Sequence, residues 1–380
     1  MSILFICGCL ETGKDGVGDY TQILARELYL KNIEVSIISY NDAFVKGATF
    51  REDGVLNILR LGIDLSAEKK IELAKQFVNA NNPDLISLQF VPYAYHQKGL
   101  PWRLGLELSK IGKKFSWHIM FHELWVEEKD FKNLVISKIQ EAIIKRLVTL
   151  LDPVLVHTSI PVYQKRLETI GIAAMPLPIY SNIKVDANQK HQDLNTFMIT
   201  FFSQLSPRKE ILSFLKMLIA SLKREKISFK LLIVGGTTKA KQELEKQLKE
   251  IPQISNKIEQ IGFLQDHELS KVIASTALGI SPVPRHLLGK SGSVATFLSH
   301  GIPVAAPYVK MGHNVDEVGF FNTKMSKVLV IEPASENIFM ATQKARTLSK
   351  IYSRSAIAEV FIEDLMLISN IQEINLNLIT

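Results

Sequence analysis

The sequence predicts an α/β fold with two Rossmann-like, doubly wound domains, each built on a parallel sheet. Short apolar runs rich in β-branched residues alternate with longer amphipathic runs, which is typical of βαβ units. A stretch with several prolines and asparagines interrupts the alternation at 176–195, after which the alternation restarts. A chain of 380 residues is also long for a single α/β core and suits two domains.

The first domain is expected over residues 1–178. Its strands are predicted where β-branched and other apolar residues cluster, at Ile3–Cys7, Val35–Ser39, Leu85–Gln89, Phe115–Met120 and Val154–His157. The periodicity between them predicts helices that include Tyr20–Leu30, Ala67–Asn79 and Phe131–Leu150. The tail, 354–380, has an apolar helical pattern, so we expect it to pack back on this domain and complete it.

The second domain is expected over residues 196–353, after a linker at 179–195. Its predicted strands are Thr196–Phe202, Phe229–Val234, Ile258–Ile261, Leu278–Ser281, Pro303–Ala306 and Val328–Ile331. Its predicted helices are Glu210–Arg224, Lys239–Glu250, Glu268–Ser275, Val294–Ser299 and Glu336–Leu348.

Composition narrows the classes of partner and the compartment. The formal charge of +7 favours phosphate-bearing ligands or a weak peripheral contact with an anionic membrane. Nucleic acid is not expected, because lysine and arginine are scattered among acidic residues and form no basic stripe. The first ten residues lack a basic segment and predict a strand, and no apolar run is long enough to span a bilayer. Cys7 and Cys9 fit free thiols in a reducing cytoplasm.

Ligands of open α/β sheets bind outside the carboxyl ends of the strands, so the loops there hold the candidate site. After the first strand, Gly16 and Gly18 open a helix, where backbone amides and the helix dipole favour an anion. The third glycine of the dinucleotide-binding pattern is absent. The alternative is a turn that only packs the helix on the strand.

A basic pair lies at the start of the first helix of the second domain. Arg208 and Lys209 oppose the helix dipole there, which makes sense if a dianion lies between them and the amides. The preceding strand end contributes Ser203. Two solvated basic side chains are the alternative.

A third loop combines two glycines, two serines and a lysine before a helix. This Gly289–Ser293 segment has the chemistry of a phosphate cradle, with backbone donors, hydroxyls and one mobile cation. It differs from a Walker loop in spacing and chain position. A plain loop is the alternative.

Two histidines, His118 and His122, lie on one face at the end of a first-domain strand. Their spacing is not the helical pattern of a zinc site and a third ligand is not evident, so no metal is expected. We interpret His118 as a packing residue and His122, where the strand ends, as a functional one.

Taken in order, several stretches resemble the retaining GT-B glycosyltransferases of family 4, with two domains facing a cleft. The stretches are Gly16–Tyr20, Phe121–Glu123, Leu177–Ile183, Pro207–Lys209, Ile261–Leu264 and His300–Val304. The resemblance implies a hexosyltransferase that moves a sugar from a nucleotide diphosphate sugar to an acceptor hydroxyl. It also implies that the second domain holds the donor and the first holds the acceptor.

The resemblance assigns roles to the matching residues. Arg208 and Lys209 match the pair that contacts the diphosphate, and His122 matches the histidine near the transferred sugar. The donor-binding set is Gly16, Gly18, Ser203, Phe263, Leu264, Gly289, Lys290, Ser291, Gly292, Ser293 and Thr296. The proposed acceptor-binding set, at the first-domain strand ends and aromatic loops, is Asp19, Tyr93, Trp102 and Trp125.

The chain departs from the family pattern at one point. The two glutamates that the family usually carries fall at Leu288 and Thr296, of which only Thr296 can hydrogen-bond a ribose hydroxyl. Two alternatives therefore stay open: a nucleotide-sugar epimerase or hydrolase using Asp19 and Glu123, and a non-catalytic donor-binding or scaffold subunit. Since no Asp-Xaa-Asp occurs, a metal-bridged diphosphate is not expected and no cofactor is predicted.

Overall fold

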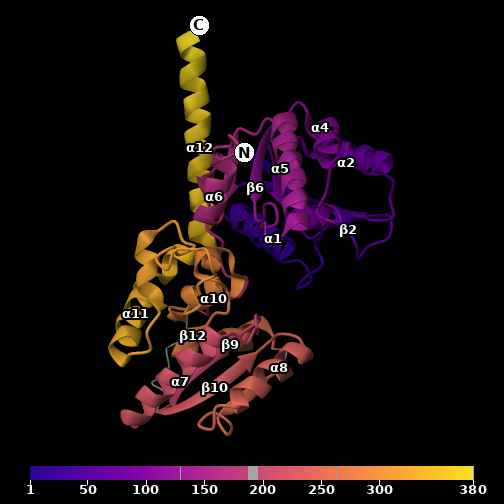
Figure 1. Ribbon diagram of the computed structural model, residues 1–380. Helices are drawn as coiled ribbons and strands as arrows, with labels where there is room; N and C mark the ends of the chain where they lie inside the picture. Colours follow the sequence, from indigo (N-terminus) through magenta and orange to yellow (C-terminus); the bar gives the residue numbers. More distant parts are fainter. Residues whose placement is uncertain (129, 187–195, 263, 380) are drawn as a thin grey trace. The chain divides into compact units, whose positions relative to one another are not determined.

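The computed structural model describes residues 1–128, 130–186, 196–262 and 264–379, with side chains of the last helix described through Ile368. The chain forms two compact units (Figure 1). The first contains Met1–Leu177 together with Ala358–Thr380, and the second contains Pro178–Ile357. Both have parallel sheets, which confirms the predicted α/β class.

The sheet of the first unit has the order β3-β4-β2-β1-β5-β6-β7-β8. Its pairs are parallel except for β3 and β4, which are antiparallel. The strands are β1 (Ser2–Cys7), β2 (Glu34–Asp42), β3 (Ala48–Glu52), β4 (Asn57–Gly62), β5 (Leu85–Phe90), β6 (Ser116–Phe121), β7 (Leu155–Thr158) and β8 (Met175–Pro176). The central strands are buried on both faces, as parallel strands covered by helices should be.

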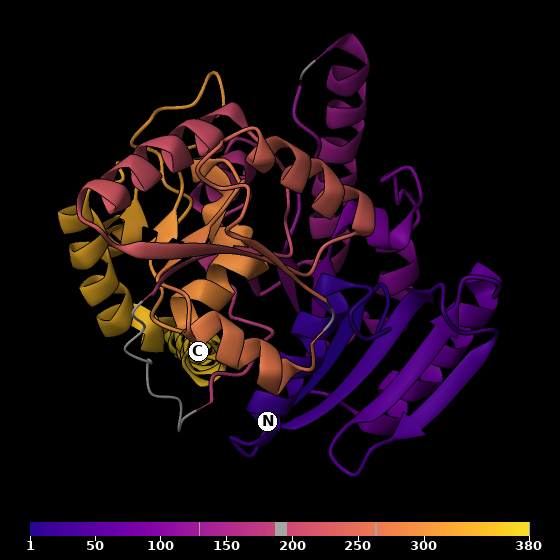
Figure 2. The same ribbon diagram turned by 90° about the horizontal axis from the view of Figure 1, so that it is seen from below.

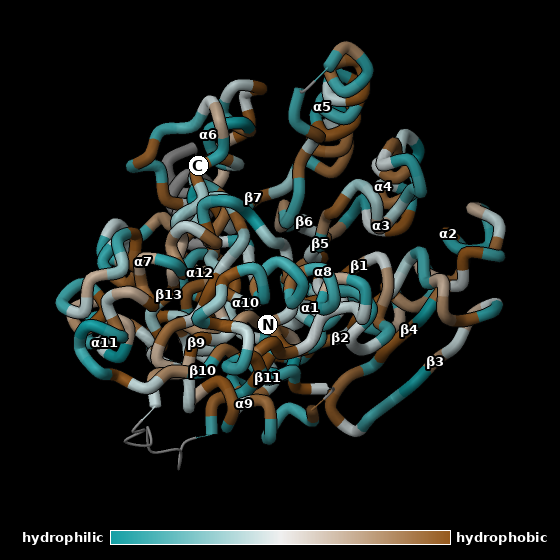
Figure 3. The backbone as a smooth tube through the Cα atoms, turned by 60° about the horizontal axis from the view of Figure 1, so that its bottom comes forward, coloured by the Kyte–Doolittle hydropathy of each residue, from teal (hydrophilic) through white to brown (hydrophobic). Residues whose placement is uncertain are grey.

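The helices of the first unit are α1 (Gly16–Tyr29), α2 (Ala67–Asn81), α3 (Pro92–Tyr95), α4 (Leu104–Gly112), α5 (Phe131–Leu151), α6 (Pro161–Glu168) and most of α12 (Arg354–Ile379). Side chains of Asp15, Ser66 and Asp130 cap α1, α2 and α5 by accepting hydrogen bonds from first-turn amides. Hydrophobic and hydrophilic residues alternate along α5 (Figure 3), which buries Ile143, Ile144 and Leu147.

The sheet of the second unit is parallel throughout, in the order β11-β10-β9-β12-β13-β14. The strands are β9 (Thr196–Phe202), β10 (Ser228–Val234), β11 (Ile258–Ile261), β12 (Leu278–Ile280), β13 (Val304–Ala305) and β14 (Leu329–Val330). The central position of β9 brings the loops after β9 and β12 together at the carboxyl edge of the sheet.

Helices cover both faces of the second sheet (Figure 2). They are α7 (Lys209–Arg224), α8 (Thr238–Lys249), α9 (Asp266–Ala274), α10 (Gly292–Ser299) and α11 (Ser335–Leu348), with 3-10 helices η1 (Arg285–Lys290), η2 (Thr323–Val328) and η3 (Ser349–Tyr352). Successive residues of β10 face opposite cores: Leu231 and Ile233 pack with α7 and α8, whereas Leu232 and Val234 pack with α9 and α10.

The two ends of the second unit are joined by one arginine. The guanidinium of Arg354 donates hydrogen bonds to the carbonyl oxygens of Ser181 and Asn182. The chain therefore enters and leaves this unit at the same place. Among the described residues, no helix has the length and apolar character that crossing a bilayer needs.

Candidate functional site

The loop after β1 is built around the two predicted glycines, which have different surroundings. Asp15 accepts hydrogen bonds from the amides of Val17 and Gly18, which starts α1. A Cβ atom on Gly18 would lie 2.1 Å from the carbonyl oxygen of Cys9, whereas one on Gly16 would meet no atom within 4 Å. Gly18 is thus required for close packing, and Gly16 presents an exposed backbone at the helix start.

A buried carboxylate that sequence analysis did not single out fixes the base of this loop. Asp42, at the end of β2, accepts hydrogen bonds from the Leu10 amide and from the Arg60 guanidinium, whose Nε lies 2.8 Å away. Burial alone would raise the pKa of Asp42, but hydrogen bonds from Arg60, Phe44, Ser39 and Leu10 lower it to about 2. The carboxylate therefore stays ionised and holds β1, β2 and β4 together where they end.

The predicted acceptor residue Asp19 shapes the same loop. Its two carboxylate oxygens accept hydrogen bonds of 3.1 and 3.2 Å from the amide of Gly13, which has a positive φ of 71°. This contact closes the loop over the start of α1.

His122 lies directly after β6, at the carboxyl edge of the first sheet. Its amide donates to the carbonyl oxygen of Phe90, and its Nε2 lies 2.9 Å from Oε1 of Gln89. The ring of Tyr20 meets the imidazole edge to face at 4.8 Å. His122 is 8% exposed, so these contacts hold a nearly buried imidazole at the end of β6.

The predicted packing residue His118 is fully buried, but it also makes polar contacts. Its Nδ1 lies 2.8 Å from Oγ of Ser87, and its Nε2 lies 3.1 Å from Nδ1 of His157. Burial lowers the pKa of His118 well below its ordinary value, so its imidazole is neutral.

The aromatic residues predicted to bind the acceptor have three different environments. Trp102 is half-exposed and lines a 370 Å³ pocket in the first unit, shared with Tyr40, Lys70 and Glu107 among others. Tyr93 is half-exposed and outside this lining. Trp125 is buried under the Arg166 guanidinium, which lies 4.5 Å from the ring centre.

The pocket around Trp102 also contains a buried cation. Nζ of Lys70 lies 3.1 Å from Oδ1 of Asn41 and 5.7 Å from the centre of the Tyr40 ring. Burial lowers the pKa of Lys70, while the carboxylates of Glu107 and Asp64 oppose that shift.

The predicted basic pair lies at the carboxyl edge of the second sheet. Arg208 is the residue before α7; its Nε donates to the carbonyl oxygen of Pro282 at 3.0 Å, and its guanidinium lies 3.9 Å from the centre of the Tyr308 ring. These partners follow β12 and β13, so Arg208 bridges the loops of three strands. Lys209, the first residue of α7, is exposed.

The predicted phosphate cradle folds into the end of η1 and the start of α10. Ser291 caps the helix by accepting a hydrogen bond from the Val294 amide at 3.4 Å, and its hydroxyl lies 3.0 Å from that of Ser293. Gly292 is exposed, and a Cβ there would meet no atom within 4 Å. Gly292 is therefore the exposed residue at the start of α10, and Lys290 beside it is half-buried.

The two positions matched to the family glutamates both face inward. Leu288 is 0% exposed and belongs to the hydrophobic core that contains Val294 and Phe320. Thr296 is buried, and its hydroxyl donates to the carbonyl oxygen of Gly292 and lies 3.0 Å from Oγ of Ser181. Both positions serve packing within the unit.

The remaining predicted donor residues lie near the same edge. Ser203 directly follows β9, has a positive φ of 63°, is exposed and donates a hydrogen bond from its amide to the carbonyl oxygen of Val234. Leu264 is half-buried and packs against the second core. Gly289 is buried, and Phe263 lies outside the described residues.

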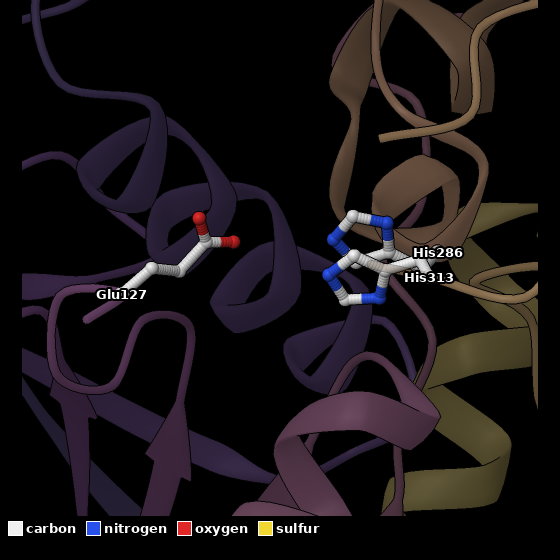
Figure 4. A group of neighbouring side chains, drawn as sticks. All are labelled: Glu127, His286 and His313. Atoms are coloured by element: carbon white, nitrogen blue, oxygen red, sulfur yellow. The ribbon is translucent and has the colours of Figure 1, made fainter. Parts of the chain in front are cut away.

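Two histidines of the second unit, His286 and His313, have no role that the sequence predicts. The rings of His286 and His313 stack face to face, 3.5 Å between centres and 5° apart in plane (Figure 4). Burial, and then the proximity of His313, lower the pKa of His286 to about 4. Glu127, also labelled in Figure 4, belongs to the first unit.

The stacked pair joins two loops that Arg285 also connects. The Arg285 guanidinium donates to the carbonyl oxygens of Ala306 and Val315 at 2.8 and 2.9 Å. The segment after β13 is therefore fixed against η1, next to the loop that carries Gly292. Only tertiary contacts reveal this arrangement, because Arg285 and Val315 are far apart in sequence.

Within each unit taken alone, the described residues contain no three histidine, cysteine or carboxylate side chains close enough to share a metal ion. The metal-independent site stays a prediction.

Comparison with known proteins finds a family match within the second unit. Residues 196–342 match the model of the glycosyl transferases group 1 family. No curated protein matches the sequence. This stretch contains β9 to most of α11, and with them Arg208, Lys209 and the start of α10.

Solved structures share the fold across nearly the whole chain. An α,α-trehalose 6-phosphate synthase from Burkholderia multivorans has a TM-score of 0.62 at 11% identity, covering 98% of each chain. Anabaena HepE, solved with UDP and glucose, has a TM-score of 0.57 at 17% identity, covering 96% of this chain and 99% of the other. A protein described as a putative UDP-N-acetylglucosamine 2-epimerase from Listeria monocytogenes has a TM-score of 0.53 at 10% identity, covering 95% of this chain and 94% of the other. The chain has the GT-B fold, and residues 196–342 of its second unit match the model of the group 1 glycosyltransferases.

Proposed function

We propose that the chain is a hexosyltransferase that moves a sugar from a nucleoside diphosphate sugar to an acceptor hydroxyl without a divalent metal ion. The observation that carries this proposal is the arrangement of Arg208 in the group 1 domain. Its guanidinium is fixed by Pro282 and Tyr308 at the carboxyl edge of the sheet, beside the exposed Lys209. Fixed cations at this edge suit a diphosphate ligand.

The charge that develops during transfer explains why such cations would matter. The sugar acquires oxocarbenium character while the departing nucleoside diphosphate gains negative charge. Arg208, Lys209, Lys290 and the exposed backbone of Gly292 at the start of α10 would stabilise that charge. Because Arg208 is already held by protein partners, little reorganisation would be needed during the reaction.

We assign the acceptor to the first unit. Its 370 Å³ pocket combines the half-exposed Trp102 with Tyr40 and the buried cation of Lys70. An aromatic face beside polar groups suits the ring of a sugar acceptor. His122, at the end of β6, would hydrogen-bond a hydroxyl close to the reacting atoms. We infer from family likeness alone that the anomeric configuration is retained.

The acceptor assignment predicts a selective defect in one variant. Trp102→Ala should raise the KM for the acceptor about tenfold, because a stacking surface of about 1–2 kcal/mol is lost, while nucleotide affinity stays unchanged. Tyr93→Ala, a half-exposed aromatic outside the pocket, is the control. Equal acceptor KM values in wild type and Trp102→Ala would contradict the assignment.

Binding and product analysis test the proposed function. The melting temperature should rise when UDP, GDP, UDP-glucose or GDP-mannose is added, for at least one of these nucleotides. The ligand that binds is then incubated with the protein alone and with candidate sugar acceptors. A glycoside formed only with an acceptor supports transfer. Free sugar or an epimer from donor alone would establish the epimerase or hydrolase alternative, and binding without turnover would establish a donor-binding subunit.

A further inference from the structure

A continuous line of buried polar side chains crosses the first unit from His122 to α12. Oε1 of Gln89 lies 2.9 Å from Nε2 of His122, and Nε2 of Gln89 lies 2.8 Å from Oγ of Ser87. Ser87 lies 2.8 Å from His118 Nδ1, and His118 Nε2 lies 3.1 Å from His157 Nδ1. The line ends where His157 Nε2 lies 3.0 Å from Oδ2 of Asp364 on the last helix.

Strand register places these groups in one row. Ser87 of β5 is directly opposite His118 of β6, and His157 lies on the next strand, β7. Phe361, one turn before Asp364, packs its ring against both His118 and His157, 5.0 and 5.9 Å between centres. Ser87, His118 and His157 are 0% exposed and Gln89 is 1% exposed, so the line excludes solvent along most of its length.

The carboxylate at the end of the line determines which atom donates each hydrogen bond. An ionised Asp364 can only accept, so Nε2 of His157 carries a hydrogen and Nδ1 of a neutral His157 is an acceptor. Nε2 of His118 must then donate to His157, which leaves Nδ1 of His118 to accept from the Ser87 hydroxyl. Each imidazole thereby has one possible tautomer.

The same logic continues to the candidate site. The Ser87 hydroxyl, which donates to His118, accepts from the Gln89 amide nitrogen, and this orients Oε1 of Gln89 toward His122. Oε1 accepts from Nε2 of His122, so in the neutral form of this ring the hydrogen lies on Nε2 and Nδ1 carries the acceptor lone pair.

The reverse direction needs an additional proton. Gln89 would donate to Nε2 of His122, and donor and acceptor would be exchanged in each hydrogen bond further along the line. His157 would thereby donate from Nδ1 to Nε2 of His118. His157 would then be either a buried cation or the acceptor of a proton from Asp364. Burial disfavours a charge at this place, and the pKa of the adjoining His118 is lowered by the same burial.

We propose that Asp364 is a positioning residue that acts through His157, His118, Ser87 and Gln89 to fix the tautomer of His122. With Nε2 protonated, Nδ1 is the hydrogen-bond acceptor of the His122 ring. The effect of this tautomer on turnover rests on the proposed function, whereas the tautomer itself does not. The C-terminal helix thus specifies the chemistry of a side chain at the opposite end of the line.

The test is a long-range ¹H–¹⁵N correlation spectrum of the ¹⁵N-histidine-labelled full chain without substrates, which distinguishes the two neutral tautomers. In the wild type, His122, His118 and His157 should all carry hydrogen on Nε2. Asp364→Asn should give His122 a mixed or changed tautomer, because an amide can either donate or accept. Glu363→Gln, an exposed carboxylate next to Asp364 on the same helix, should leave the spectrum unchanged.

Activity gives the second measurement. Asp364→Asn should lower kcat about tenfold or more while the donor KM stays within twofold, since the variant changes a hydrogen-bonding group and not the donor site. Ser87→Ala, which removes only one hydroxyl, should have the same two effects.

Three results would overturn the proposal. They are hydrogen on Nδ1 of His122 in the wild type, a His122 signal that neither Asp364→Asn nor Ser87→Ala alters, or an altered tautomer with unchanged kcat. If Asp364→Asn does not fold, the wild-type and Ser87→Ala spectra decide. A wild-type spectrum as predicted in a protein without transferase activity would contradict the proposed function and leave the tautomer assignment intact.

Discussion

At the scale of single residues, Lys209 gives the sharpest test of the donor site. It is exposed at the first position of α7, and among the described residues no carboxylate is ion-paired with it. Lys209→Ala should lower turnover about a hundredfold, because one group that stabilises developing charge is worth on the order of 3 kcal/mol. Steady-state kinetics check this, with Lys216→Ala, an exposed lysine of the same helix, as control. Wild-type turnover in a folded Lys209→Ala protein would exclude the lysine from the mechanism.

The lowered pKa of Asp42 predicts that the free energy of unfolding depends on pH. Its pKa of about 2 in the folded protein lies below the ordinary value of 3.8, so folding is favoured by about 2 kcal/mol above pH 4. This contribution is lost as the pH falls from about 4 to about 2, because the unfolded chain takes up the proton first. Asp42→Asn should therefore be less stable than the wild type at pH 7.

Urea unfolding of both proteins at pH 7, 4 and 3 measures this difference. The gap in the free energy of unfolding should narrow as the pH falls. Glu11→Gln, which changes the more exposed carboxylate paired with Arg60, is the control and should cost less. A gap that is constant between pH 7 and 3 would mean that Asp42 acts by packing and not by charge.

The residues of the candidate site could be predicted in part, because ligand loops follow strands in this class of fold. Arg208, Lys209 and His122 were found from their positions at strand ends. The partners that fix them were not: Tyr308 for Arg208 and Gln89 for His122 come from loops and strands distant in sequence. Asp42 was missed for the same reason, since its role depends on Arg60 from another strand.

At the scale of the element, α1 illustrates how one glycine determines a helix start. Gly18→Ala would place a Cβ 2.1 Å from the Cys9 carbonyl oxygen, which is backbone and cannot move aside. We expect a loss of about 1–3 kcal/mol in the free energy of unfolding. Gly16→Ala, two residues earlier and facing open space, should be neutral or slightly stabilising. Thermal and urea unfolding check both; equal stability of the two variants would refute the packing role of Gly18.

Strong patterns predicted the elements well, and weak patterns did not. Buried strands such as β1, β5 and β10 were predicted to within a few residues because apolar residues dominate them. The pair β3 and β4 was missed, since β3 is exposed along its whole length and has no apolar alternation. Helices α4 and α6 were not among the predicted helices. The first begins without a side-chain cap and contains two glycines, and the second is short and begins at a proline.

At the scale of the whole molecule, the proposed chemistry predicts independence from divalent ions. The sequence has no Asp-Xaa-Asp, and in the proposed mechanism Arg208, Lys209 and helix amides stabilise the negative charge of the diphosphate. Transfer rates should therefore be unchanged after dialysis against EDTA and after readdition of magnesium or manganese. Initial rates measured in both conditions check this. A rate that EDTA abolishes and manganese restores would require a different account of the leaving group.

The division of the chain into two units has a bearing on its synthesis. The first unit is closed by residues that follow the entire second unit, and these include Phe361 and Asp364. A nascent polypeptide on the ribosome must therefore build β5, β6 and β7 long before the helix that covers His118 and His157 exists. Until then those imidazoles face water or a chaperone, and the row of hydrogen bonds has no terminus. A product of premature termination would carry every residue of the donor loops, but its His122 would lack a defined tautomer.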